Sequence, residues 1–167
     1  MTKTIKTNNE YIPFPIKILK KKNESADTFT LRLDWQVDHD PGQFIQVSIP
    51  GIGEAPISIS SYSKKYLEIS IRKVGNVTNA LFNLKKGDTL LVRGPYGKGY
   101  PMDNLKGNNI IFIGGGCGVA PLKGAIEYVE RKRKEFGDVI LFIGYRSPGD
   151  ILFSHKQKIW DDNFKVH

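Results

Sequence analysis

Hydrophobic and polar residues alternate in short segments along the first part of the chain. The alternation covers residues 16–18, 29–33, 45–49, 57–60 and 67–72. A repeat of two residues is typical of strands with one buried face, and clusters of turn-forming residues separate the segments. Several short strands at roughly ten-residue spacing predict a closed antiparallel barrel or a sandwich.

Two more elements follow in the same half of the chain. Residues 76–84 carry Leu81 and Leu84 three positions apart, which predicts a short helix. Residues 89–93 alternate again and predict a last strand, and the polar stretch 104–108 marks a boundary.

A different pattern begins after this boundary. Ile110 to Ile113 form a continuous apolar run, which predicts a short strand buried on both faces. Glycines follow at once, and then a helix whose first position suits Pro121. The apolar stripe of this helix consists of Leu122, Ile126 and Val129.

This second unit looks incomplete. Residues 139–143 predict a second strand, and the pattern predicts no further strand before His167. Two parallel strands and one crossover helix bury too little surface to be stable alone. We therefore expect this unit to lean on the barrel and a partner, or to be a fragment.

The glycine-rich turn between the strand and the helix is the main candidate site. Gly114–Gly116 and Gly118 remove side chains, so main-chain amides could approach a pyrophosphate at a helix N-terminus. The dinucleotide fingerprint G-x-G-x-x-G is not matched, because its last glycine would fall at Val119 or Pro121. By spacing alone, phosphate binding and an ordinary tight turn both stay open.

Composition narrows the class of protein. The chain has 167 residues of which 40% are hydrophobic, as in a globular protein with a sizeable core. No apolar run approaches the roughly 18 residues of a membrane helix, so we expect no membrane insertion and a cytoplasmic protein. One cysteine, Cys117, and three histidines offer no metal-ligand spacing. We expect no protein-bound metal.

The net charge of +8 is compatible with several anionic partners. Its densest runs, residues 20–22 and 131–134, are flanked by acidic residues, which favours a solvated face over a nucleic-acid surface. An acidic partner protein or an anionic cofactor would use the same field.

The order of the motifs resembles the ferredoxin–NADP reductase superfamily. It combines a barrel, Gly-x-x-Thr at residues 75–78, Gly-Pro-Tyr-Gly at residues 94–97 and the run GGGCGVAPL from Gly114. Within the superfamily the chain is most similar to electron-transfer subunits, such as those of anaerobic sulfite reductase, sulfhydrogenase and dihydroorotate dehydrogenase. The resemblance implies an antiparallel Greek-key flavin-binding barrel, followed by part of a parallel α/β nucleotide-binding domain. The expected division is a flexible tail at 1–12, the barrel at 13–104 and the α/β part at 105–167.

The resemblance also implies an FAD site on the barrel. The family motif Arg-x-Tyr-Ser aligns with residues 55–58, where Ala55 and Ile57 replace the arginine and the tyrosine. Ser58 is the implied catalytic residue, near the flavin nitrogen that receives hydride, and its alternative is an ordinary strand serine. We expect Arg72 to supply the missing charge; its alternative is a surface arginine. The implied FAD-binding residues are Pro56, Ile57, Ser58, Ile59, Ser60, Arg72, Val74, Gly75, Asn76, Val77 and Thr78.

A second set of residues is implied to bind NAD(P)H. The family's pyridine-nucleotide turn aligns with the glycine-rich turn, and Tyr145 and Arg146 fall where the family often handles the adenosine ribose. The set is Gly114, Gly115, Gly116, Cys117, Gly118, Val119, Ala120, Pro121, Tyr145 and Arg146. The choice between NAD and NADP stays open.

The resemblance therefore predicts a flavoprotein subunit that passes electrons between NAD(P)H, FAD and an iron–sulfur partner. The chain lacks the family's cysteine cluster for a [2Fe–2S] centre, because one thiolate cannot hold it. Such a cluster would belong to a missing C-terminal part or to a partner, the iron–sulfur or catalytic subunit of a redox complex. Two alternatives are a truncated FAD-binding docking module and a basic barrel that binds nucleic acid.

Overall fold

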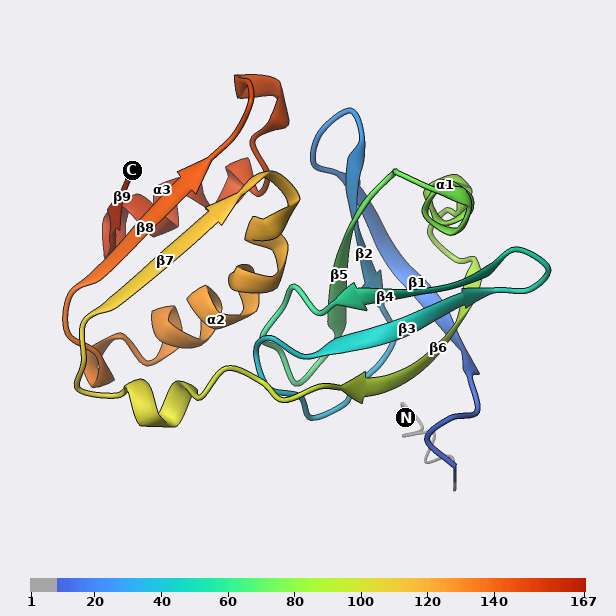
Figure 1. The fold of residues 1–167 in the computed structure, drawn as a ribbon, viewed down its shortest axis with the longest axis horizontal. Helices are drawn as coiled ribbons and strands as arrows, with labels where there is room; N and C mark the ends of the chain where they lie inside the picture. Colours follow the sequence, from blue (N-terminus) through green and yellow to red (C-terminus); the bar gives the residue numbers. More distant parts are fainter. Residues whose placement is uncertain (1–8) are drawn as a thin grey trace.

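Six antiparallel strands form the first half of the molecule. The computed structural model describes residues 9–167, so most of the expected tail at 1–12 lies outside the described residues. The strands are β1 (Phe14–Asn23), β2 (Thr28–Leu33), β3 (Phe44–Ile49), β4 (Gly53–Ser58), β5 (Leu67–Arg72) and β6 (Thr89–Tyr96). Their order in the sheet is β4-β3-β6-β1-β2-β5. An antiparallel bridge between Ile59 and Ile69 joins the two ends of this order, which confirms the predicted antiparallel barrel (Figure 1).

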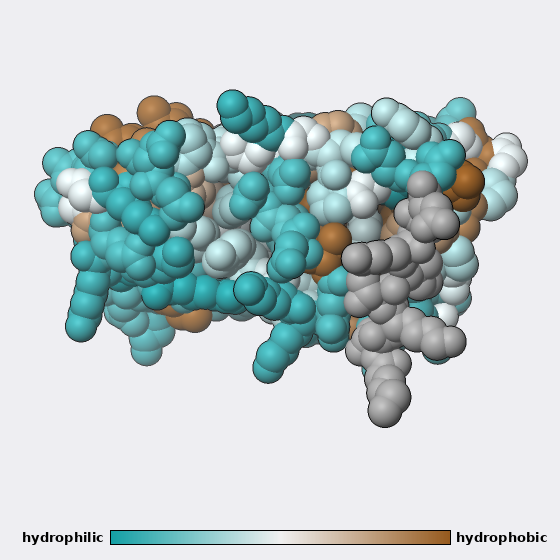
Figure 2. Space-filling model, turned by 90° about the horizontal axis from the view of Figure 1, so that it is seen from below, coloured by the Kyte–Doolittle hydropathy of each residue, from teal (hydrophilic) through white to brown (hydrophobic). Residues whose placement is uncertain are grey.

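The alternation seen in the sequence places one face of each strand inside the barrel. Phe29, Leu31, Ile45, Val47 and Ile69 are all fully buried. Two polar residues beside them, Thr30 and Ser70, are also buried, and their hydroxyls lie 2.8 Å apart. Hydrophilic side chains cover most of the underside of the molecule (Figure 2). Burial of each large apolar side chain contributes about 1.5–3 kcal/mol, so this interior is the main source of the barrel's stability.

A single short helix, α1 (Asn76–Asn83), follows β5. Leu81 is fully buried and belongs to the barrel core, with Val77 and Phe82 packed against that core. This apolar side of α1 fixes the helix beside the barrel, with its N-terminus next to the end of β5 (Figure 1).

The second half is a three-stranded parallel sheet with helices. Its order is β7-β8-β9, and α2 and α3 contribute to one core with the sheet. The bounds are β7 (Ile110–Gly115), α2 (Val119–Arg131), β8 (Val139–Gly144), α3 (Ser154–Asn163) and β9 (Lys165–Val166). Four short 3-10 turns lie between or beside them: η1 (Met102–Leu105), η2 (Gly116–Gly118), η3 (Arg133–Glu135) and η4 (Pro148–Asp150).

The expectation of no further strand before His167 was wrong. β9 pairs in parallel with β8 through Lys165 opposite Ile140 and Val166 opposite Leu141. A strand of two residues is too short to show a periodicity of its own. The unit also has a second helix, α3, whose Trp160 is buried in the same core.

The prediction that the apolar run in β7 is buried on both faces was also wrong. Ile110 and Phe112 are 7% and 8% exposed, whereas Ile111 and Ile113 are 58% and 74% exposed. Both helices therefore cover the same face of the sheet, and the other face is open among the described residues. A run of isoleucines has the same pattern whether one face or two are covered, because every position is apolar.

The start of α2 differs from the prediction by two residues. The helix begins at Val119, directly after η2, and Pro121 is its third residue. Proline is tolerated there because the amides of the first turn have no intrahelical partner.

Candidate functional site

The turn after β7 is open where the sequence predicted a cradle. A Cβ atom added at Gly116 or at Gly118 would meet nothing within 4 Å. Gly116 has a φ of +51°, which favours glycine. Gly114 has another role, because its added Cβ would lie 2.9 Å from Leu122 Cδ1 and 3.3 Å from Val119 Cγ2, so glycine lets α2 pack closely on the strand. The three glycines therefore divide into one for close packing and two that leave space beside the backbone.

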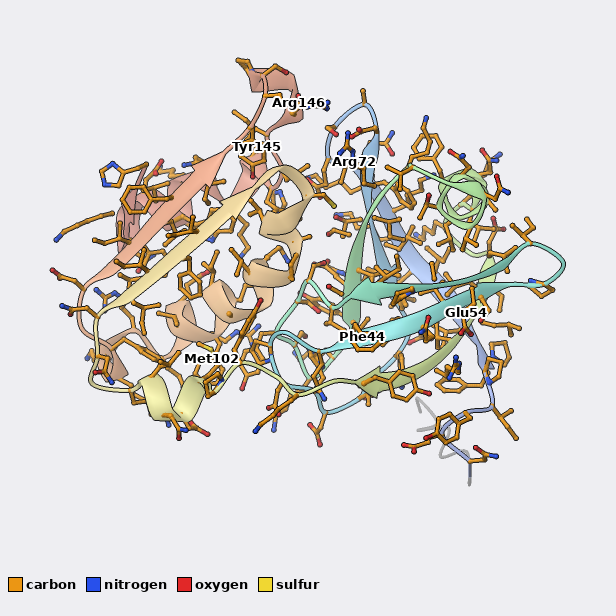
Figure 3. The ribbon with its side chains drawn as sticks, in the orientation of Figure 1. Phe44, Glu54, Arg72, Met102, Tyr145 and Arg146 are labelled. Carbon is orange, nitrogen blue, oxygen red and sulfur yellow. The ribbon has the colours of Figure 1, made fainter. Side chains whose placement is uncertain are left out.

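A pocket of about 650 Å³ adjoins this turn. It lies between the two halves, because its walls come from the β1–β2 loop, the end of β5, η2 and the segment after β8. Figure 3 shows Arg72 on one side of the turn, and Tyr145 and Arg146 on the other. The lining residues are Ser25, Asp27, Thr28, Arg72, Gly115, Gly116, Cys117, Gly118, Gly144, Tyr145, Arg146, Asp150 and Leu152.

Arg72 supplies positive charge to this pocket. Its Nε donates to Asp27 Oδ2 over 2.8 Å, and this hydrogen bond lowers the pKa of Asp27 to about 2. Asp27 is therefore ionised at neutral pH and anchors the guanidinium through one nitrogen. Arg72 lies closer to η2 than the sequence suggested, since Arg72 and Cys117 line the same pocket. Burial raises the pKa of the Cys117 thiol.

The two residues after β8 have different environments. Tyr145 is half-buried, burial raises the pKa of its hydroxyl, and that hydroxyl donates weakly to the Leu152 carbonyl over 3.5 Å. The Arg146 side chain is 73% exposed and forms an ion pair of 3.5 Å with Asp150. Arg146 is thus a loosely held cation at the pocket rim, free to meet an anionic ligand.

The N-terminus of α1 is a second open turn. Thr78 Oγ1 accepts hydrogen bonds from the amides of Val74 and Gly75, at 3.0 and 2.9 Å, and donates to the Gly75 carbonyl. The Thr78 hydroxyl therefore shapes the turn from within. The amides of residues 76–78 precede Asn79, whose amide donates to Gly75 in the first intrahelical bond. A Cβ atom added at Gly75 would meet nothing within 4 Å, so the turn is open beside Gly75.

The predicted flavin strand is only partly accessible. Ile57 and Ser58, at the end of β4, are half-buried. Ile59 and Ser60 are buried, and Ser60 Oγ lies 2.9 Å from Ser70 Oγ. The side chains of Val119 and Ala120 are buried as well. These four residues could reach a ligand only through their backbones.

Both open turns lie at the same end of β5. This strand ends at Arg72, and α1 begins four residues later at Asn76. The η2 turn contacts β5 across the gap between the two halves. The structure therefore brings two glycine-bearing helix starts, more than thirty residues apart in sequence, to the same end of β5, and Arg72 lines the pocket at the second of them.

These features fit the diphosphates of two dinucleotides. Unpaired amides at helix starts favour anions, Arg72 adds a cation, and a Cβ would meet no atom at Gly75, Gly116 or Gly118. Sequence reasoning missed Asp27 and Asp150, which hold the two arginines of the pocket. The sequence gives only a weak indication that Asp27 belongs to the site, because it is one polar residue in the turn before β2.

A barrel with an open glycine turn at a helix start, joined to an α/β unit with another such turn, is the architecture of oxidoreductases that combine a flavin with a pyridine nucleotide. The profile of the oxidoreductase FAD-binding domain matches residues 15–100, and that of the oxidoreductase NAD-binding domain matches residues 112–165. The chain belongs to the oxidoreductase FAD-binding domain family, within the ferredoxin–NADP reductase superfamily.

Individual relatives agree with this assignment. Sulfhydrogenase 1 subunit gamma of Pyrococcus furiosus is 39% identical over 87% of this chain and 53% of its own length. A probable dihydroorotate dehydrogenase B (NAD(+)) electron transfer subunit of Methanocella arvoryzae is 35% identical over 86% of this chain and 52% of its own length. The chain thus spans about half the length of the curated relatives that it matches.

Solved structures support the same fold. Ferredoxin-NADP+ reductase from Plasmodium falciparum superposes with a TM-score of 0.80 at 21% identity, over 93% of this chain and 69% of that one. The Amycolatopsis cytochrome P450 reductase GcoB superposes with a TM-score of 0.77 at 27% identity, over 92% of this chain and 51% of that one.

Residues 9–167 also lack two kinds of feature. No helix there has the length and apolar character needed to span a bilayer. No group of three or more His, Cys, Asp or Glu side chains there is placed to hold a metal ion.

Proposed function

We propose that this chain is the FAD- and NAD(P)H-binding part of an electron-transfer subunit. The observation that carries the proposal is the position of the two open turns, which flank the end of β5 on the same side of the molecule. Two dinucleotides held there would extend their reactive rings toward the same gap between the two halves. The division into a barrel at 13–104 and an α/β part at 105–167 is part of this proposal.

The FAD site consists of the α1 turn and the end of β4. The amides of residues 76–78 receive the diphosphate, Arg72 adds charge, and Val74 and Gly75 border it. Pro56, Ile57 and Ser58 lie beside the ring system, with the Ser58 hydroxyl as the hydrogen-bonding group. Ile59, Ser60 and Thr78 act differently from the sequence expectation, because their side chains are buried or engaged with other residues.

The NAD(P)H site is the 650 Å³ pocket. The η2 turn and the first residues of α2 receive the diphosphate through amides, while Tyr145 and Arg146 border the adenosine end. FAD bound beside this pocket supplies two-electron acceptance from NAD(P)H and one-electron release to an iron–sulfur group. The chain positions the two cofactors relative to each other, and the half-buried walls limit water between the two sites.

We also propose that a second redox subunit receives the electrons. The relatives are named as subunits of sulfhydrogenase and dihydroorotate dehydrogenase B, and the described residues contain no metal cluster site. A [2Fe–2S] centre in a partner subunit, or in a part of the protein beyond this chain, would take that role. Because NAD(P)H is a cytoplasmic reductant, we place the protein in the cytoplasm.

Rapid mixing of the FAD-loaded chain with NADH or NADPH tests the proposed function. We expect anaerobic bleaching of the visible flavin band faster than that of free FAD, because the two sites hold the reacting rings close together. Comparison of the two nucleotides also determines the preference between NAD and NADP. Bleaching no faster than free FAD with both nucleotides would favour a docking module that binds flavin without oxidising NAD(P)H.

Substitution of Arg72 tests its part in FAD binding. We expect Arg72→Gln to weaken FAD binding roughly tenfold, since it removes one charge-assisted hydrogen bond to a phosphate, and the loss should be larger at low salt. Fluorescence titration of the apoprotein with FAD measures it. Arg131→Gln is the matched control, because Arg131 stacks over Tyr62 away from both turns. Equal FAD affinity in the two variants would remove Arg72 from the site.

A further inference from the structure

A buried lysine fastens the nucleotide-binding helix to the barrel. Lys123 lies on α2 and is 2% exposed. Its Nζ donates to Glu127 Oε1 over 2.9 Å, to the Ser60 carbonyl over 2.9 Å and to Glu68 Oε2 over 3.0 Å. Glu68 and Ser60 belong to the barrel, whereas Lys123 and Glu127 belong to the α/β half. The ammonium group therefore bridges the two halves.

Each charged group around Lys123 has an oppositely charged partner. Burial by itself lowers the pKa of Lys123, but the adjacent Glu127 and Glu68 raise it above the usual value. Glu68 also accepts two hydrogen bonds from Arg32, at 2.9 and 2.8 Å on Oε1. The lysine is thus charged, and Lys123 and Arg32 together hold the pKa of Glu68 below its usual value against the effect of burial.

Two further contacts fix the same side of α2 to the same barrel segment. Glu127 Oε2 accepts a hydrogen bond from the Tyr62 amide over 2.9 Å. Gly124 lies so close to the barrel that an added Cβ would be 3.1 Å from the Ser61 carbonyl oxygen. Three residues of α2 therefore meet residues 60–62 in succession.

This contact lies close to both proposed cofactor sites. Lys123 is four residues beyond Val119, or about 6 Å along a helix, and so lies one turn from η2. Ser60 is two residues beyond Ser58, or about 7 Å along an extended chain. Any shift of α2 against residues 60–62 would therefore move the nucleotide turn relative to the end of β4.

We propose that Lys123 is a positioning residue that sets the separation and angle between the nicotinamide and flavin sites. The proposal rests on the proposed function, because it assigns a purpose to the contact between the two halves. Replacing every member of a buried ion pair or triad by apolar residues often leaves stability unchanged, so such a cluster is weak evidence for a purely stabilising role. Their directional bonds nevertheless fix one geometry, and hydride transfer depends on geometry to within about 1 Å.

The test compares Lys123→Met with Lys156→Met in the FAD-loaded chain. Lys156 also approaches Glu127, at 3.8 Å, but forms no ion pair with the barrel among the described residues. In Lys123→Met, Glu68 keeps Arg32 and Glu127 keeps the Tyr62 amide, so we expect the variant to fold and to retain FAD. Its hydride-transfer rate at saturating nucleotide should fall about 100-fold with unchanged nucleotide affinity. The long-wavelength charge-transfer absorption between nicotinamide and flavin should weaken, and Lys123→Arg should restore part of both signals.

Two outcomes would overturn the proposal. One is a wild-type rate and charge-transfer absorption in Lys123→Met. The other comes from Gly124→Ala, which is used if Lys123→Met does not retain FAD. Gly124→Ala keeps every charge and displaces α2 by a few tenths of an ångström. A wild-type rate in Gly124→Ala would reject a positioning role, and a reduced rate would support it.

A failure of the proposed function is distinguishable from a failure of this inference. If the unmodified chain is not reduced by NADH or NADPH, hydrogen exchange of the apoprotein still tests the contact. The Tyr62 amide should exchange faster in Lys123→Met than in Lys156→Met. Equal exchange would show that Lys123 does not hold the two halves together.

Discussion

A Gly118→Val variant is expected to keep FAD and to lose about 100-fold in affinity for NADH and NADPH. Gly118 has φ −64° and ψ −13°, which any L-residue adopts, so the backbone need not change. An added Cβ meets nothing within 4 Å, and valine would therefore occupy the space proposed for the diphosphate. Loss of two charge-assisted hydrogen bonds of about 1.5 kcal/mol each gives the expected factor.

Isothermal titration of the FAD-loaded variant with each nucleotide measures this change. The flavin spectrum before titration serves as an internal check, because retained FAD shows that the barrel is intact. An unchanged nucleotide affinity would mean that the η2 turn is an ordinary strand-to-helix turn, and the proposed NAD(P)H site would be wrong.

The reciprocal variant, Gly75→Val, is expected to lose FAD and to keep nucleotide binding. Gly75 has φ −159° and ψ −179°, an extended conformation that valine favours, and its added Cβ also meets open space. The valine side chain would lie against the amides of residues 76–78 and keep a phosphate away. By the same two-bond reasoning we expect FAD affinity to fall about 100-fold.

Fluorescence titration with FAD, and calorimetric titration of the apoprotein with the nucleotide, measure the two affinities separately. Each glycine variant is the other's control, since both insert the same side chain at a helix start. If Gly75→Val binds FAD normally, the diphosphate does not lie at α1. If both variants lose both ligands, the two sites are coupled through the fold.

The sequence predicted the barrel well because the alternation along each strand indicates which of its positions are buried. In residues 45–49 the apolar Ile45 and Val47 are buried and the polar Gln46 and Ser48 are half-buried, so burial follows the pattern. Residues 29–33 differ at Thr30, which is buried although it is polar. The α/β half was harder to predict. The all-apolar β7 carries no information on how many faces are covered, and the two-residue β9 is specified by its pairing with β8.

In the candidate site, too, the sequence predicted some features and not others. The glycines and the helix starts are local features. The sequence located the turn at 114–118 by its spacing and by resemblance, and the turn at 75–78 by resemblance. The partners of the charged residues are not local: Arg72 pairs with Asp27, and Lys123 meets Glu68, across 45 and 55 positions of the chain. No periodicity encodes such pairs.

The sequence by itself determined where backbone amides are left without side chains, because glycine and helix-start preferences act within a few residues. It also determined which strand faces are apolar. Only the tertiary structure decided that the two open turns lie at the same end of β5, that Ser60 points inward, and that Lys123 joins the halves. These properties depend on how distant segments pack, and packing is a property of the whole chain.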